Sequence, residues 1–309
     1  MPYKALVTGG AGFVGHHLVN RLLEEGHTVA VLDDLSSGFK EQVSSEASFF
    51  EGSICSKHDL RESMEDCDVV YHLAAEVELQ KSLLDPAGCL SANACGTANV
   101  IMETQRIIDR RLVFASSCAL YPLIMKGPLS VEMGRNGETP YALSKSVGEE
   151  LIKIYSALGG LNACVLRCFN IYGKNQRSES DYAAVVSKFL SCAASGKWLP
   201  VYGTGEQTRD FIHVDDVVDA YLVAGQSKVN GVFNVGTGIA TSILKLAQMI
   251  SNLSGSEGIK FFPARKNDAH SSIADMQSSK AILGFKPKIT LIEGLTMLID
   301  EMNIEYRDD

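Results

Sequence analysis

Apolar and polar positions alternate along the chain in blocks of two kinds. Short continuous apolar runs, typical of strands buried on both faces, lie near residues 4–8, 28–32, 48–50, 68–73, 111–115, 163–169 and 231–235. Between them lie longer stretches with helical spacing, near residues 13–25, 57–65, 93–108, 141–157 and 215–225. Strands that alternate with helices of this length predict an α/β fold with a doubly wound parallel sheet.

The pattern changes in residues 174–210 and beyond residue 240. These parts carry helix-like stretches near 182–195, 242–251 and 291–301, and a short strand near 259–262. We expect them to form a smaller C-terminal α/β lobe, of residues 174–210 plus 239–309, over the ends of the sheet strands. The sheet domain then comprises residues 1–173 plus 211–238, and a substrate lies in the cleft between the two.

Composition narrows the functional classes. The chain has 309 residues, of which 46% are hydrophobic and 21% charged, as in an ordinary globular enzyme. Its net charge of −9 argues against a nucleic-acid partner, which would require basic patches. No apolar run approaches membrane length, and we expect a cytoplasmic protein that needs no membrane. The eight cysteines include no Cys-x-x-Cys pair and predict free thiols in a reducing compartment, with no metal site.

The first strand enters a glycine-rich turn, Gly9-Gly10-Ala11-Gly12-Phe13-Val14-Gly15, that opens a helix. A second strand follows and ends in Asp33-Asp34. This order is typical of a dinucleotide-binding Rossmann-type domain, in which glycines admit the pyrophosphate to the helix N-terminus and an acid accepts from the ribose hydroxyls. A carboxylate at Asp33 repels a 2′-phosphate, so the sequence predicts NAD as the cofactor rather than NADP.

Tyr141 and Lys145 lie four residues apart at the start of a predicted helix, so both project from one face. A phenol is a poor base at neutral pH, but a nearby ammonium favours the phenolate. Ser117 ends a buried strand 24 residues before Tyr141, at the sheet edge where ligands bind. We therefore expect Ser117, Tyr141 and Lys145 to be the catalytic residues of a hydride-transfer site. For His72, near the end of another strand, we favour packing over catalysis.

The motifs of this chain resemble those of the extended short-chain dehydrogenase/reductase family, in its nucleotide-sugar epimerase/dehydratase branch. The resemblance covers nearly the whole chain. The motifs that carry it are Thr8 to Gly15, His72 to Ala75, Asn93 with Gly96-Thr97, Ser116 to Tyr121, Tyr141 with Lys145, Arg167 to Gly173, Arg209 to Val217, and Arg265 with Asp268.

The resemblance implies a UDP-sugar substrate and a homodimer. The residues implied for NAD binding are Gly9, Gly12, Phe13, Val14, Gly15, Asp33, Asp34, Ser36, Gly38, Ser53, Ile54, Leu73, Ala74, Ala75, Asn93, Tyr141, Lys145 and Phe169. Those implied for the substrate are Ser117, Asn170, Arg209, Arg265, Asp268 and Ser272. In the implied dimer, helices near 93–108 and 141–157 form a four-helix seam.

The resemblance favours 4-epimerisation through a transient 4-keto intermediate. Dehydratases and decarboxylases of the family require acidic residues after the catalytic serine or threonine. This chain has Cys118 and Ala119 at these positions. Those two reactions, a simple NAD-dependent dehydrogenase and a non-catalytic NAD-binding regulator remain the alternatives. The sugar stays open between plain hexoses and their N-acetylated forms, because Ser272 stands where some galactose epimerases carry Tyr. A uronic acid stays possible.

Three positions depart from the family pattern. Pro122 follows Tyr121 where Gly is usual, Ser53 replaces an Asp that would accept from the adenine amino group, and Val77 stands where galactose epimerases often have Lys. The departures leave the contacts of NAD near Ser53 and Val77 open.

Overall fold

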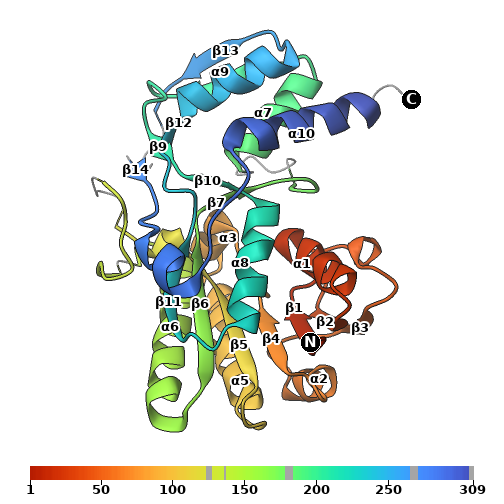
Figure 1. Cartoon of the computed structure of the whole chain (residues 1–309). Helices are drawn as coiled ribbons and strands as arrows, with labels where there is room; N and C mark the ends of the chain where they lie inside the picture. The colour runs from red at the N-terminus through yellow and green to blue at the C-terminus, as the bar shows by residue number, and fades with distance from the viewer. Residues whose placement is uncertain (123–126, 136, 178–183, 265–270, 306–309) are drawn as a thin grey trace.

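The computed structural model describes residues 1–122, 127–135, 137–177, 184–264 and 271–305. Its main sheet has seven parallel strands in the order β11-β6-β5-β4-β1-β2-β3 (Figure 1). The bounds are β1 Lys4–Thr8, β2 Thr28–Asp33, β3 Ser48–Glu51, β4 Val69–His72, β5 Arg111–Ser117, β6 Asn162–Cys168 and β11 Gly231–Val235. The strand order reverses between β1 and β4, which confirms the predicted doubly wound α/β fold.

Helices cover both faces of the sheet (Figure 1). On one face α1 (Phe13–Glu24) and α8 (Val214–Gln226) pack on a core that includes Val7, and on the other α2 (Lys57–Ser63), α5 (Gly96–Thr104) and α6 (Pro140–Gly159) pack on a core that includes Leu6. Because successive strand residues point to opposite faces, an uninterrupted apolar run such as Ala5-Leu6-Val7 supplies both cores at once.

A smaller lobe lies beyond the carboxyl ends of the strands (Figure 1). It contains α7 (Val185–Ala194), α9 (Ile243–Ser254), α10 (Leu291–Glu305) and the pair β8 (Leu199–Tyr202) and β13 (Ile259–Phe262). Phe189, Leu246 and Leu298 contribute to its separate core. The boundaries that we assign to the two lobes stay a prediction.

Short strands connect the sheet domain with this lobe. β7 (Asn170–Tyr172) pairs with β10 (Phe211–His213), and β9 (Thr208–Arg209) pairs with β12 (Thr241–Ser242) and with β14 (Ser271–Ser272). These pairs place residues from distant parts of the sequence side by side between the sheet domain and the smaller lobe.

The region between β4 and α5 differs from our prediction of one helix near 93–108. Two short helices, α3 (Leu79–Leu84) and α4 (Pro86–Leu90), precede a π-helical turn at Ser91–Cys95, and α5 ends at Thr104. Asp85 caps α4 by accepting from the Gly88 amide, and Pro86 occupies its first turn, so a new helix begins there. None of the helices in the described part of the chain combines the length and apolar composition that crossing a bilayer requires.

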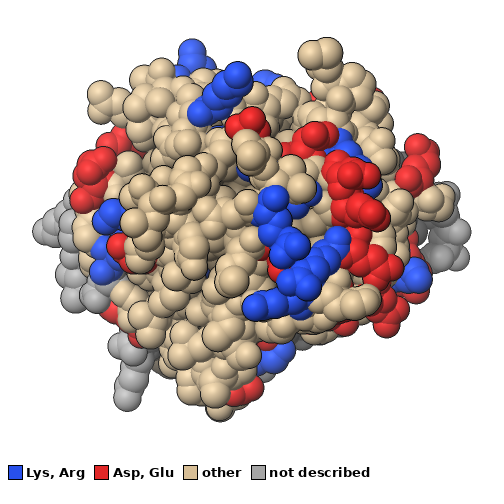
Figure 2. All heavy atoms as spheres, turned by 90° about the horizontal axis from the view of Figure 1, so that it is seen from below, with Lys and Arg blue, Asp and Glu red and all other residues tan. Residues whose placement is uncertain are grey.

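Figure 2 shows the molecule from below, on the side away from the smaller lobe. Lys and Arg side chains form a compact group on this face, and Asp and Glu side chains lie directly beside them (Figure 2). The two signs of charge therefore offset each other on this surface.

Candidate active site between the two lobes

Tyr141, Lys145 and Ser117 meet at the carboxyl end of the sheet. Thr139 caps α6 by accepting from the Ala142 amide, so Tyr141 and Lys145 lie in the first two turns of that helix. Ser117 is the last residue of β5, and its hydroxyl is hydrogen-bonded to the Tyr141 phenol. The Lys145 ammonium donates to the Ala115 carbonyl at 2.9 Å. The structure thus brings the three predicted catalytic residues together.

The charges of this triad differ from our expectation. Burial raises the pKa of Tyr141 to about 12, and the hydrogen bond from Ser117 acts in the opposite direction. Burial also lowers the pKa of Lys145 to about 8. Burial, and not the charge of the other group, therefore sets the direction of both pKa shifts in the protein chain alone.

The glycine turn leaves room that side chains would fill. Gly9 has φ +73°, and a Cβ there would lie 2.7 Å from the Ala74 nitrogen. A Cβ on Gly15 would lie 2.0 Å from the Gly9 carbonyl oxygen. No side chain caps the start of α1 at Gly12, so the first amides of the helix, beginning at Phe13 and Val14, can receive a phosphate. This cradle fits a dinucleotide pyrophosphate.

Asp33 fixes the loop around the turn. Its carboxylate accepts from the backbone amides of Ala11 and Leu35, each at 2.9 Å, and burial raises its pKa. Asp34 is exposed and accepts from the Ser36 amide at 3.0 Å. Each oxygen of Asp33 keeps a second lone pair, so these bonds are compatible with its predicted contact to ribose hydroxyls.

A close backbone contact holds Gly38 against the same turn. A Cβ on Gly38 would lie 2.6 Å from the Ala11 carbonyl oxygen. The Phe39 amide donates to that oxygen at 3.2 Å. Two of our predicted cofactor residues, Asp33 and Gly38, therefore contact Ala11 from two sides.

His72 is a packed histidine, as we predict. Its Nδ1 lies 2.8 Å from the Thr8 hydroxyl and its Nε2 lies 2.9 Å from the Thr97 hydroxyl. Complete burial lowers the pKa of His72 to about 3, so the ring is neutral at ordinary pH. The Thr8 hydroxyl also accepts from the Ala74 amide at 3.3 Å and so anchors the loop of Leu73, Ala74 and Ala75.

Asn93 holds the neighbouring loop rather than offering a free amide. Its side chain donates to the Glu76 carbonyl and the Ser144 hydroxyl, each at 2.9 Å, and accepts from the Glu76 amide at 2.7 Å. These bonds tie the loop after β4 to the catalytic helix. An indirect role, in positioning the loop, therefore fits Asn93 better than the direct cofactor contact that we expected.

Ser53 and Ile54 follow β3 at the same edge of the sheet. The Ser53 amide donates to the Asp59 carboxylate at 3.0 Å, and Ile54 is 7% exposed. A Cβ on Gly96 would lie 2.5 Å from the Ile54 side chain, so Ile54 packs closely on the start of α5.

Besides Ser117, the predicted substrate residues that the structure describes lie on the short strands β7, β9 and β14. Asn170 begins β7 and donates through its side chain to the Asp210 carbonyl at 3.1 Å. Arg209 and Ser272 are register partners in the β9–β14 pair. Phe169, next to Asn170, is buried and lies 6.1 Å from Tyr121 between ring centroids. Arg265 and Asp268 lie outside the described residues.

Ser272 faces the catalytic strand. Its side chain hydrogen-bonds to the thiol of Cys118, the residue after Ser117, and only 8% of Ser272 is exposed. Burial raises the pKa of that thiol to about 11. Ser272 therefore lies beside the candidate catalytic residue Ser117, and its role toward the sugar stays a prediction.

Sequence reasoning missed two buried polar groups that support the site. Glu149, one turn beyond Lys145, forms bonds of 2.8 and 2.7 Å with Arg167 and accepts from the Ser116 hydroxyl. Asp210 is fully buried and accepts from four donors. The sequence offered one signal for such a group, a charged residue directly before an apolar run. Asp210, which precedes Phe211, fits that description.

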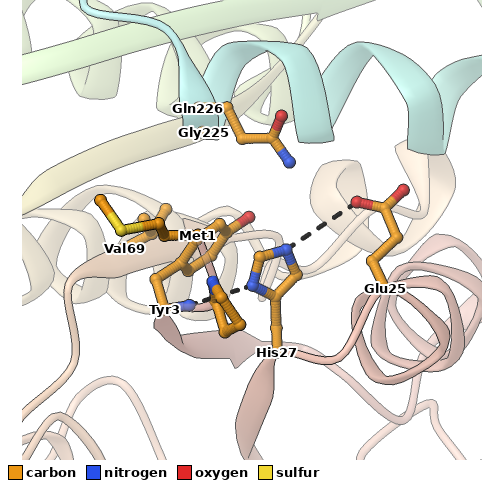
Figure 3. Close-up of a pocket in the computed structure, with 8 residues that line it drawn as sticks. Met1, Tyr3, Glu25, His27, Val69, Gly225 and Gln226 are labelled. Carbon is orange, nitrogen blue, oxygen red and sulfur yellow. Dashed lines mark hydrogen bonds and ion pairs between the residues drawn. The ribbon is translucent and has the colours of Figure 1, made fainter.

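A separate pocket lies at the opposite end of the sheet (Figure 3). It measures about 510 Å³ and is lined by residues that include Tyr3, Val69 and Gln226. His27 lies between Glu25 and Tyr3 there, and its Nδ1 accepts from the Tyr3 amide at 3.1 Å (Figure 3). The pocket contains none of the predicted catalytic, cofactor or substrate residues.

Comparison with known proteins yields a family and named relatives. The family model described as "NAD dependent epimerase/dehydratase family" matches residues 5–236. A "Putative UDP-glucose 4-epimerase" of Methanocaldococcus jannaschii is 35% identical over 98% of this chain and 99% of its own length. A "UDP-N-acetyl-alpha-D-glucosaminuronate decarboxylase" of Bacillus cytotoxicus is 32% identical, with 96% of each chain covered.

Solved structures similar to this chain also include nucleotide-sugar epimerases. A UDP-glucose 4-epimerase of Thermotoga maritima, solved with UDP-glucose, has a TM-score of 0.94 and 32% identity over 98% of this chain and 99% of that one. A UDP-N-acetylglucosamine 4-epimerase of Methanobrevibacter ruminantium, in complex with UDP-N-acetylmuramic acid, has a TM-score of 0.94 and 30% identity, with 99% of each chain covered.

Proposed function

Because the chain belongs to the NAD-dependent epimerase/dehydratase family, with NAD as its cofactor, we propose that it is a UDP-hexose 4-epimerase. The substrate pair is UDP-N-acetylglucosamine with its galacto epimer, UDP-glucose with UDP-galactose, or both. Similar proteins include decarboxylases as well as epimerases, so the choice of reaction rests on residues of this chain.

The observation that carries the proposal is the pair Cys118-Ala119 directly after Ser117. A dehydratase requires an extra acid and base at these positions, and a decarboxylase requires a carboxylate there. The Cys118 thiol is neutral at ordinary pH, because burial raises its pKa to about 11. Ala119 has no titratable side chain. Oxidation followed by reduction at one carbon needs neither group, which favours epimerisation.

The residues can perform this chemistry with one base. Bound NAD supplies the acceptor and later the donor of the hydride. Tyr141 accepts the proton of the sugar 4-hydroxyl as the hydride leaves C4, and returns it when the hydride comes back on the other face. Ser117 shares the same substrate oxygen and bonds to the phenol. Lys145, held by the Ala115 carbonyl, keeps positive charge near the phenolate.

We expect NAD to stay bound through purification and to be regenerated in every cycle. Acid extraction should release about one NAD per chain, since the glycine turn and Asp33 form the cradle described above. On a UDP-hexose, chromatography should show the C4 epimer without accumulation of free NADH. Stoichiometric NADP in the extract, or tight NADP binding by calorimetry, would contradict the cofactor assignment.

The products of the same assay separate the alternatives. Net NADH indicates a simple dehydrogenase, carbon dioxide from a UDP-uronic acid indicates a decarboxylase, and a dehydrated 4-keto sugar indicates a dehydratase. NAD binding without turnover of any nucleotide sugar supports a regulator instead of an enzyme.

Ser272 provides the prediction about the sugar. Replacing it with Tyr should fill the space that an N-acetyl group requires, because Ser272 lies against Cys118 beside the catalytic strand. We expect Ser272→Tyr to reduce turnover of the N-acetylated pair far more than turnover of plain hexoses. Ser272→Ala keeps the space and serves as the matched control. Equal loss on both sugars, or no turnover of the N-acetylated pair by the unmodified enzyme, would argue against this gate.

We also propose a homodimer through the two helices of the expected seam. Val100, Ile101 and Ile152 lie on these helices but are at most 4% exposed and belong to the sheet core, so they cannot supply the dimer surface. The apolar side chains that remain exposed on α3, α5 and α6 are Leu79, Leu83, Leu84, Met102, Leu143, Ile154 and Leu158.

Sedimentation at micromolar concentration should give a dimer, and Ile154→Glu should shift it toward monomer, whereas Lys153→Glu should not. A monomer at that concentration refutes the proposal.

A further inference from the structure

The side chain of Asn234, near the end of β11, makes three hydrogen bonds inside the protein. It has no exposed surface, and its oxygen accepts from the Tyr121 hydroxyl at 2.6 Å. Its nitrogen donates to the Leu129 carbonyl at 2.7 Å and to the Asp275 carbonyl at 3.0 Å. An asparagine amide has two N–H donors, and both are used here, so the group has no donor left for another ligand.

The partners of Asn234 belong to two segments, one that follows Ser117 and one that follows Ser272. Tyr121 comes four residues after Ser117, and Asp275 comes three residues after Ser272. The two segments also bond to each other at Leu129, whose amide donates to the Ile273 carbonyl at 2.7 Å and whose carbonyl accepts from the Asp275 amide at 3.1 Å. Asn234 therefore bonds to both segments. We call the contact between them, at Leu129 and residues 273–275, the seam of the substrate site.

Asp210 holds the Ser272 segment at a second point. Its carboxylate accepts from the Ala274 amide at 3.1 Å, and also from the Gly238 amide and from the amide and hydroxyl of Thr237. Asp210 adjoins Arg209, a candidate substrate residue, so altering it would disturb binding directly. Asn234 adjoins no candidate substrate residue, and its effect on the site acts only through the seam.

On the basis of the proposed function, we propose that Asn234 is a positioning residue for the substrate site. Its amide fixes the distance between the Ser272 segment and the end of the catalytic strand, and so sets the width of the space in which the sugar is held. Loss of its two donors takes one of two partners from the Leu129 carbonyl and the side-chain partner from the Asp275 carbonyl, and so weakens the link between the segments.

Asn234→Asp tests this role with little change of shape. The variant keeps an oxygen toward Tyr121 but turns an oxygen toward the Leu129 and Asp275 carbonyls. We expect the KM for the UDP-sugar to rise about tenfold with a smaller change in kcat, and NAD content to stay at about one per chain. The defect should grow with pH, because a buried carboxyl has a raised pKa and can still donate when protonated.

Hydrogen exchange gives a readout that needs no substrate. Peptides spanning residues 127–133 and 271–277 should exchange faster in Asn234→Asp, while peptides from β6 should not. Ser279→Ala is the matched control, because Ser279 donates to the backbone carbonyl of Asn234 at 2.6 Å and leaves the amide intact. If Asn234→Asp does not accumulate in folded form, Asn234→Ser removes at least one of the two donors without adding charge.

The outcomes separate this proposal from the proposed function. If the unmodified enzyme turns over no UDP-sugar, the proposed function is refuted but the role of Asn234 is not. The affinity for UDP, measured by calorimetry, then replaces KM as the test of that role. In an active enzyme the selectivity change caused by Ser272→Tyr should shrink in the Asn234→Asp background and persist in the Ser279→Ala background. Unchanged exchange at the seam, or faster exchange with unchanged KM and UDP affinity, overturns the proposal.

Discussion

Replacing Tyr141 with Phe is expected to lower the rate of epimerisation by about 10²–10⁴-fold, the range typical of a general acid–base group. The substitution removes only the phenolic oxygen, which is the group that exchanges a proton with the sugar. The ring remains, so α6 keeps its packing and NAD should remain bound. Single-turnover rates and NAD content, measured on the same preparation, test both parts.

Two controls sharpen this result. Tyr155→Phe changes a second tyrosine of α6 outside the site and should leave turnover unaltered. The pH profile of the unmodified enzyme should rise with pH in a limb that belongs to Tyr141, because its pKa is raised and only the phenolate accepts a proton. The Phe variant should lack that limb. Turnover near that of the unmodified enzyme in Tyr141→Phe would show that another group is the base.

Lys145→Ala is expected to damage turnover and NAD affinity together. The ammonium is 4% exposed and donates to the Ala115 carbonyl, so its removal leaves a buried acceptor without its partner. We expect turnover to fall by about 10²–10⁴-fold and NAD affinity by about 10–100-fold, as for loss of a charge-assisted hydrogen bond. Stopped-flow rates and calorimetric titration of NAD into cofactor-stripped protein measure the two losses.

Lys145→Met separates charge from packing in this experiment. Methionine fills much of the space of the lysine stem, which lies over the Phe114 ring with Nζ 5.1 Å from its centroid. Loss of NAD affinity in Lys145→Met as large as in Lys145→Ala assigns the effect to the charge. Retention of full NAD affinity in both variants would remove Lys145 from the cofactor site.

The sequence was sufficient for the sheet because its central strands, such as β1 and β4, are apolar runs buried on both faces. Leu6 and Val7, neighbours in β1, serve opposite cores, and such a run needs no knowledge of tertiary structure to be recognised. Two-residue strands such as β9 and β14 carry no periodic signal, so their pairing could not be foreseen. The helix start at Pro86 was missed because α4 has only five residues.

The site was predicted unevenly for a physical reason. Tyr141, Lys145 and Ser117 are tied to local features, namely a helix start and a strand end, and these carry a sequence signal. The roles of Asn93, Asp210 and Asn234 depend on partners far away in the chain. The same holds for Val100, which lies on a helix of the implied dimer seam and which packing on the sheet buries completely.

The position of β11 has a consequence for how the chain is made. β6 pairs with β5 on one side and with β11 on the other, but residues 169–230 must be synthesised between β6 and β11. At about 5–20 residues per second, β6 waits about 3–12 s on the ribosome with one edge unpaired. An apolar strand with an open edge is a template for wrong pairing. The open edge of β6 is therefore the part of the sheet most exposed to wrong pairing while the chain is being made.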